Sequence, residues 1–155
     1  MKDGTPRRQR TAPSRGRIIR TRSRGGTFRA ARDLARGFRG GEVVLLVGEL
    51  GAGKTVFAQG ISSGLGLEDV SQVCSPSYTL LNIYDARVPI FHFDLYRLSE
   101  ASEILDLGWE DFLDRGVIIV EWGERLPLEV EALRVTIEVG EGTRRTITVT
   151  PSTRP

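Results

Sequence analysis

Residues 48 to 55 have the composition and spacing of a phosphate-binding loop. They read GELGAGKT and fit the pattern G-x-x-x-x-G-K-T. Glycine lets the backbone curl so that successive N–H groups face a phosphate, and Lys54 can reach the β- and γ-phosphates of a nucleotide. The Thr55 hydroxyl can bind the Mg²⁺ that bridges these phosphates. We therefore expect ATP and Mg²⁺ to bind at Gly48, Leu50, Gly51, Ala52, Gly53, Lys54 and Thr55.

Two acidic residues follow apolar runs that predict strands. Val117–Val120 precedes Glu121, and Ile90–Phe93 precedes Asp94. Ligands of open α/β sheets bind at the carboxyl ends of the strands, so Glu121 is expected to hold Mg²⁺ and orient the attacking water. Asp94 is expected near the γ-phosphate, which makes Lys54, Asp94 and Glu121 the candidate catalytic residues. A merely solvated Glu121, and an exposed ion pair between Asp94 and Arg97, are the alternatives.

His92 and Trp122 adjoin these acids in the sequence. In an alternating strand Phe91 and Phe93 point away from His92, which favours a half-buried histidine with its hydrogen bonds made over a catalytic base. Trp122 either covers the site or packs beside it.

The elements around these residues predict an α/β fold of the P-loop NTPase type. An apolar run at 42–47 predicts a strand buried on both faces, which leads through the loop into a helix over about 54–65. We expect a mostly parallel central sheet flanked by helices, with a C-terminal β-hairpin. The other expected elements are an edge strand at 16–21, a turn at Gly25-Gly26, a helix at 27–38 capped by Thr27, extended segments at 70–73 and 78–84, a strand at 88–95, helices at 100–106 (capped by Ser99) and 109–114, a strand at 117–120, and hairpin strands at 133–139 and 144–149.

Composition limits the class of protein. A chain of 155 residues with 39% hydrophobic and 27% charged residues is typical of one soluble domain. No apolar run is long enough for a membrane span, and the arginine-rich start lacks the apolar stretch of a secretory signal, so we expect a cytoplasmic protein without membrane contacts. With one cysteine and one histidine, neither an internal disulfide nor a Cys/His zinc cluster is expected.

Charge is unevenly distributed along the chain. Residues 1–24 carry nine basic side chains and one acidic one, which leaves 13 basic and 19 acidic side chains for residues 25–155. We expect residues 1–16 to form a basic, disordered arm and residues 17–155 to form a single domain. An acidic body is a poor partner for nucleic acid, so any contact with RNA would come through the arm.

Five segments together carry a family resemblance. They are GELGAGKT followed by Phe57, SPSYTLLNIY at 75–84, FHFDLYRL at 91–98, Leu107-Gly108 with Glu110, and IIVEWGERL at 118–126. In this order they resemble the TsaE (YjeE) family, the bacterial P-loop ATPases of tRNA threonylcarbamoyladenosine synthesis. The resemblance spans about Thr27 to Val149. It does not cover the residues before Arg17, and Val56 stands where a second threonine is common.

The resemblance implies an ATPase that acts with TsaB and TsaD, the assembly that transfers a threonylcarbamoyl group from an adenylate to adenosine beside the anticodon. By the same resemblance, the ATPase would not perform the transfer, and its nucleotide cycle would reset the assembly between turnovers. Contact with tRNA would be indirect, through the basic arm.

The resemblance also implies roles for individual residues. Lys54 and Thr55 match the phosphate and magnesium positions, Glu121 matches the metal-side acid, and Asp94 matches the acid of HFDLYR. Trp122 matches the tryptophan after the acid. Thr79 lies in a segment that resembles a switch loop able to sense the γ-phosphate. On the terminal hairpin, Arg144 is a further candidate for contacting the nucleotide.

Three other functions compete with this one. A small-molecule kinase would need lid arginines, but Arg87, Arg97 and Arg115 are scattered. A GTPase would be expected to show N-K-x-D and D-x-x-G, and the sequence contains neither. A nucleotide-gated scaffold with little hydrolysis overlaps with the ATPase and remains open.

We expect deletion of residues 1–16 to leave ATP affinity unchanged, because this arm lies outside every element assigned above. Calorimetric titration with ATP and thermal unfolding of the full and shortened chains would measure this. A large loss of affinity or thermal stability would show that the arm is part of the folded structure.

Overall fold

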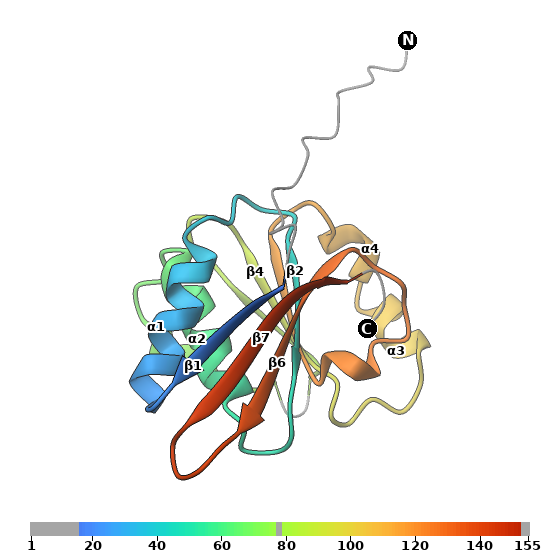
Figure 1. Ribbon diagram of the computed structural model, residues 1–155. Coiled ribbons are helices and arrows are strands. Elements are labelled where there is room, and N and C mark those ends of the chain that lie inside the picture. Colours follow the sequence, from blue (N-terminus) through green and yellow to red (C-terminus); the bar gives the residue numbers. More distant parts are fainter. Residues whose placement is uncertain (1–15, 77–78, 153–155) are drawn as a thin grey trace.

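The computed structural model describes residues 16–76 and 79–152, so residues 1–15 of the arm predicted at 1–16 lie outside the described residues. These residues form one seven-stranded sheet with helices on both of its faces (Figure 1). The elements in chain order are β1 (Arg17–Thr21), α1 (Arg24–Ala35), β2 (Val43–Val47), α2 (Lys54–Gly64), η1 (Val70–Gln72), β3 (Leu81–Tyr84), β4 (Ile90–Asp94), α3 (Ser102–Asp106), α4 (Trp109–Phe112), β5 (Val117–Glu121), η2 (Gly123–Arg125), β6 (Ala132–Val139) and β7 (Arg145–Ser152).

The strand order is β1-β7-β6-β2-β5-β4-β3. The central strands β6, β2, β5 and β4 are parallel to one another, as the apolar runs predicted. Each outer pairing is antiparallel: β3 with β4, β7 with β6, and β1 with β7. The sheet is therefore mixed rather than mostly parallel, because the C-terminal hairpin and β1 extend it on one side and β3 pairs antiparallel with β4 at the other.

Strand β2 is buried on both faces, as predicted. Val44 and Leu46 face the core under α1 and α2, whereas Val43 and Leu45 face the core under α3 and α4. Figure 1 shows these two helical layers on opposite sides of the sheet. Because β2 has no polar face, it can only occupy the middle of the sheet, and this fixes the position of the loop that follows it.

Helices α1 and α2 pack closely through small residues. A Cβ added to Gly60 would lie 2.4 Å from the Phe28 carbonyl oxygen and 2.6 Å from the Ala31 Cβ. One turn later, a Cβ added to Gly64 would lie 2.5 Å from the Arg32 carbonyl oxygen. Glycine at these positions lets the backbones of the two helices touch.

The first helix begins earlier than predicted. It starts at Arg24, where the Ser23 hydroxyl caps it by accepting a hydrogen bond from the Gly26 amide at 3.0 Å. The Gly25-Gly26 pair therefore lies inside the helix instead of forming a turn. Thr27 is buried rather than a cap, and its hydroxyl bonds that of Thr21 at 2.8 Å. The hydrogen bond that the Ser23 cap makes with the first turn outweighed the weak helix propensity of the two glycines.

Two further element predictions were wrong. The segment at 70–73 is a 3-10 turn, because the Asp69 carboxylate accepts from the Ser71 amide at 3.0 Å and closes it locally. Helix α3 begins at Ser102, and Ser99 does not cap it through its side chain. Instead the Glu103 carboxylate accepts from the amides of Ser99 and Glu100 at 3.0 and 2.8 Å.

Strand β3 starts later than expected, at Leu81, after Leu80 adopts a positive φ of 63°. Of the extended segment predicted at 78–84, Tyr78 lies outside the described residues. Within 16–76 and 79–152, the structure holds no helix that is long and apolar enough to cross a membrane.

Replacing Gly60 with alanine should lower the free energy of unfolding by about 1–3 kcal/mol, because the added methyl overlaps the backbone of α1. Alanine's better helix propensity, worth up to about 1 kcal/mol, would offset only part of this loss. Urea denaturation would measure it. Gly37→Ala is the matched control, since its Cβ would have only the Leu34 carbonyl at 4.0 Å. Equal stability of the two variants would contradict the close packing of α1 on α2.

Candidate functional site

The glycine-rich loop joins the end of β2 to the start of α2. Gly51 and Gly53 have φ values of +80° and +110°, a region that side-chain-bearing residues rarely adopt. Gly53 is the N-cap of α2, so the amides of the first helical turn face the loop. Gly48 is needed for packing, because a Cβ there would lie 2.8 Å from the Ile137 carbonyl oxygen on β6. Gly48 is thus required for close packing against β6, whereas Gly51 and Gly53 are required for the backbone conformation of the loop.

Lys54 is folded back over its own loop. Its Nζ donates to the carbonyl oxygens of Gly48 at 2.6 Å and Glu49 at 2.8 Å, and it lies 4.1 Å from the centre of the Trp122 ring. Burial lowers the pKa of Lys54, while the carboxylates of Glu121, Glu124, Asp94 and Glu49 oppose that shift. The ammonium is a buried cation held by neutral carbonyls and an aromatic face.

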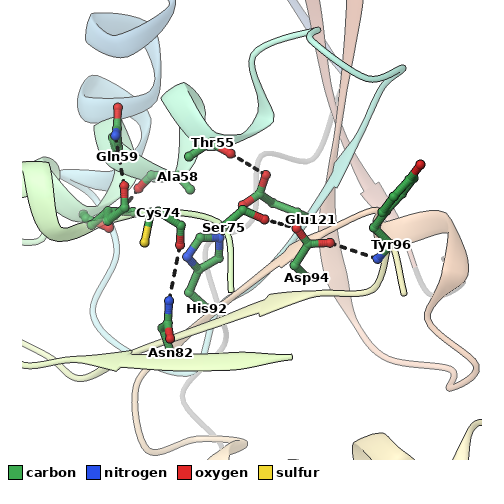
Figure 2. A network of polar contacts seen from close by, with 12 residues as sticks. Thr55, Ala58, Gln59, Cys74, Ser75, Asn82, His92, Asp94, Tyr96 and Glu121 are labelled. Atoms are coloured by element: carbon green, nitrogen blue, oxygen red, sulfur yellow. Dashed lines mark hydrogen bonds and ion pairs between the residues drawn. The ribbon is translucent and has the colours of Figure 1, made fainter. Parts of the chain in front are cut away.

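Glu121 connects the loop to the neighbouring strands. It ends β5 and is almost fully buried. Its Oε1 accepts from the Thr55 hydroxyl at 2.8 Å, and its Oε2 lies 2.5 Å from Nε2 of His92 on β4 (Figure 2). The parallel register that pairs Leu46 with Glu121 brings this carboxylate beside the loop. A merely solvated Glu121 is excluded.

Asp94 lies beside Glu121, with which it is paired in the β4–β5 register. Its carboxylate accepts from the Ser75 hydroxyl and from the Tyr96 amide, the latter at 2.9 Å (Figure 2). Two carboxylates thus end adjacent parallel strands. Their hydrogen bonds run in different directions, since Glu121 contacts α2 and β4 while Asp94 contacts the segment before β3 and the chain after β4.

The chain leading to Ser75 is held from two sides. Gln59 on α2 donates to the Val73 carbonyl at 2.9 Å, and Asn82 on β3 donates to the Cys74 carbonyl at 3.3 Å (Figure 2). Ser75 and Pro76 then form part of the wall of a cleft of about 460 Å³. The rest of the lining is Leu50, Gly51, Gly53, Lys54, Thr55, Val56, Asp94, Tyr96, Arg97, Glu121 and Trp122.

Most of the predicted site residues meet at this cleft, and the structure places four of them elsewhere. Gly48 packs beneath the loop against β6. Ala52 is fully buried and does not line the cleft. Thr79 is exposed outside the lining, where its hydroxyl donates to the Leu81 carbonyl at 3.1 Å. Arg144 is exposed and lines a second cleft of about 310 Å³ between the end of β1 and the β6–β7 turn.

Arg145, which follows Arg144, is the hairpin residue that reaches the loop. Its Nε donates to the Ala52 carbonyl at 3.0 Å, and its Nη1 donates to the carbonyls of Gly142 and Arg144 at 3.1 and 2.8 Å. Sequence reasoning missed this contact. The alternating pattern of the last strand does not show which of the two adjacent arginines points toward the loop. Only the pairing of β7 with β1 and β6 decides this.

His92 differs from its prediction as well. Phe91 and Phe93 face the opposite core, as alternation implied, but the imidazole is fully buried rather than half-buried. It bonds Glu121 through Nε2, and its Nδ1 has no hydrogen-bond partner among the described residues. Only the parallel pairing of β4 with β5 could have revealed this contact.

Fold and site define a small α/β protein in which a glycine-rich loop, a buried lysine and two strand-end carboxylates surround one cleft. The model of one family, described as threonylcarbamoyl adenosine biosynthesis protein TsaE, matches residues 21–147. The chain therefore belongs to the TsaE family, and its role lies in tRNA threonylcarbamoyladenosine biosynthesis.

Individual relatives agree with the family model. The tRNA threonylcarbamoyladenosine biosynthesis protein TsaE of Treponema pallidum is 40% identical over 100 residues, covering 64% of this chain and 73% of that protein. That of Bacillus subtilis is 40% identical over 116 residues, covering 71% and 70%. Among solved structures, Bacillus subtilis YdiB superposes with a TM-score of 0.69 at 28% identity, covering 90% of this chain and 86% of that one.

Arg145→Ala should lower the free energy of unfolding by about 1.5–3 kcal/mol, because a charged donor to the loop carbonyl of Ala52 is lost. Arg144→Ala should change it by no more than about 0.5 kcal/mol, since this side chain is exposed. Chemical denaturation of both variants measures the difference. Equal effects, or a larger effect at Arg144, would refute the contact between the hairpin and the loop.

Proposed function

We propose that this chain is the ATP-binding and ATP-hydrolysing subunit that supports a TsaB/TsaD transferase assembly in the cytosol, as a P-loop NTPase whose nucleotide cycle resets that assembly. The observation that supports it most directly is the hydrogen bond from Thr55 to Glu121 beside the buried ammonium of Lys54. This arrangement joins a phosphate-binding loop to a strand-end acid, as nucleotide hydrolysis requires.

The loop suits a nucleotide polyphosphate. Its positive-φ glycines and the free first-turn amides of α2 provide N–H donors, and the helix dipole adds positive potential there. Lys54 now donates to neutral carbonyls of its own loop. Charged phosphate oxygens accept stronger hydrogen bonds, so they can replace those carbonyls as partners.

The pair formed by Thr55 and Glu121 suits magnesium. A hydroxyl and a carboxylate are the hard oxygen ligands that Mg²⁺ takes, and this ion usually combines one or two carboxylates with phosphates and water. When bound, the ion would neutralise charge that develops on the phosphates. Thr55 and Glu121 would hold it between α2 and β5.

Hydrolysis would depend on the two carboxylates at the strand ends. Glu121 is proposed to hold the metal side and orient the attacking water, while Asp94 is proposed to contribute a second negative group near the γ-phosphate. Asp94 also accepts from Ser75, so it fixes the cleft wall formed by the segment before β3. Through that bond, a change at Asp94 on nucleotide binding would reach the segment before β3.

Membership of the TsaE family supports the partner proposal, because it places the chain in the same biosynthesis as the proposed transferase. Leu50 offers a contact for such partners, since its side chain lines the cleft and is 77% exposed. An apolar side chain at that position suits a surface that is covered when partners bind.

Glu121→Gln should reduce ATP turnover about a hundredfold or more while changing ATP affinity much less. The loop amides and Lys54, which hold the phosphates, remain in this variant, whereas metal and water placement matter most in the transition state. Affinity would be measured by calorimetry, and turnover with TsaB and TsaD present. Lys54→Ala is the contrasting variant, for which ATP binding itself should be lost.

Near-normal turnover in Glu121→Gln would mean that Asp94 is the metal-side acid instead, and Asp94→Asn would then lose activity. Binding of ATP by the parent chain without turnover, even with both partners, would favour a nucleotide-gated scaffold. Transfer of phosphate to a small acceptor rather than to water would indicate a kinase.

A further inference from the structure

The only histidine of the chain is buried against the proposed metal-side acid. His92 lies on β4, is 0% exposed, and places Nε2 at 2.5 Å from Oε2 of Glu121. Its other ring nitrogen, Nδ1, is buried and has no hydrogen-bond partner among the described residues. One nitrogen is thus engaged and the other is not.

The contact with Glu121 requires a proton on Nε2 of the imidazole. A ring protonated only at Nδ1 would point a lone pair at the carboxylate and leave a buried N–H unpaired, which is a costly arrangement. A ring with a proton on Nε2 donates to the Glu121 carboxylate, which can only accept.

We propose that His92 is a positioning residue whose Nε2–H holds Oε2 of Glu121, so that Oε1 stays directed at Thr55. A carboxylate on a two-carbon stem can otherwise rotate and present either oxygen. Because the Glu121 carboxylate accepts from Thr55 through one oxygen and from His92 through the other, it is fixed from both sides. The consequence for turnover rests on the proposed ATPase function, whereas the hydrogen bond from His92 does not.

The surroundings keep the ring in place. Phe91 and Phe93 anchor β4 in the core under α3 and α4, so His92 must face the other side. On that side the Tyr84 ring lies with its centre 6.1 Å from that of the imidazole. The backbone of β4 is paired with both β3 and β5, which leaves the strand little freedom to move the ring away from Glu121.

The direct test is nitrogen NMR of the full chain labelled with ¹⁵N-histidine, without nucleotide. With a single histidine, one pair of imidazole signals is observed, so assignment is unambiguous. We expect Nε2 to carry a proton that exchanges slowly with solvent, because it is buried and donates to Glu121. Glu121→Gln should shift the Nε2 signal. An Nε2 without a proton would overturn the proposal even if the protein is an ATPase.

The kinetic test compares three variants. His92→Gln can place an amide N–H near the position of Nε2 and should keep turnover within about threefold, whereas His92→Leu fills the site without a donor. We expect His92→Leu to lose about 10–100-fold in kcat, the range seen when the hydrogen-bond partner of a metal ligand is removed, with ATP affinity changed only slightly. Tyr84→Phe is the control for local packing, because it keeps the ring beside His92 and leaves the bond to Glu121 intact.

Equal turnover of His92→Gln and His92→Leu would show that the donor has no role in positioning. A matching loss in Tyr84→Phe, which keeps the bond between His92 and Glu121, would show that the loss does not depend on that bond, and it would also overturn the proposal. If the parent chain has no ATPase activity, the proposed function fails, and the NMR experiment still decides whether His92 holds Glu121 in this way.

Discussion

The parallel pairing of β2 with β5 places the end of one strand beside the loop that follows the other. Its register sets Leu46 opposite Glu121, so the carboxylate that ends β5 meets Thr55 at the start of α2. Neither residue could reach the other if the strands were shifted by one position, since a one-residue shift moves every side chain to the opposite face of the sheet. The site therefore depends on a pairing made largely by apolar residues that lie outside the lining of the cleft.

From that pairing, buried polar contacts extend outward. Glu121 continues to His92 on β4, Asp94 on the same strand continues to Ser75, and Arg145 on β7 binds the loop from the other side. Each contact joins elements that are far apart in the sequence. A buried polar group without a partner is costly, so these bonds hold the cleft in one arrangement and tie strands on both sides of β2 to the site.

The buried lysine shows how the site can change state. Lys54 is desolvated, lies beneath Trp122 and donates only to carbonyls of its own loop. Trp122 holds a left-handed backbone conformation with φ of 58°, which is strained for a tryptophan. Both features would respond to an anion entering the cleft, because the ammonium would exchange its partners and the ring above it would lose its contact.

The sequence by itself determined the local features. The loop pattern, the doubly buried strands β2 and β5, the terminal hairpin and the acids Glu121 and Asp94 were all predicted, because apolar runs and glycine spacing act within a few residues of the chain. The family resemblance was also carried by local segments, and the family comparison confirmed it.

Tertiary structure decided what depended on register and direction. Thr27 is buried against Thr21 of β1 instead of capping a helix, and Arg145 rather than Arg144 reaches the loop. His92 and Glu121 are 29 positions apart in the chain, and only the pairing of β4 with β5 buries one against the other. A side chain's partner across a sheet is set by how the strands align, and the free energy of that alignment is spread over the whole core rather than encoded beside the residue itself.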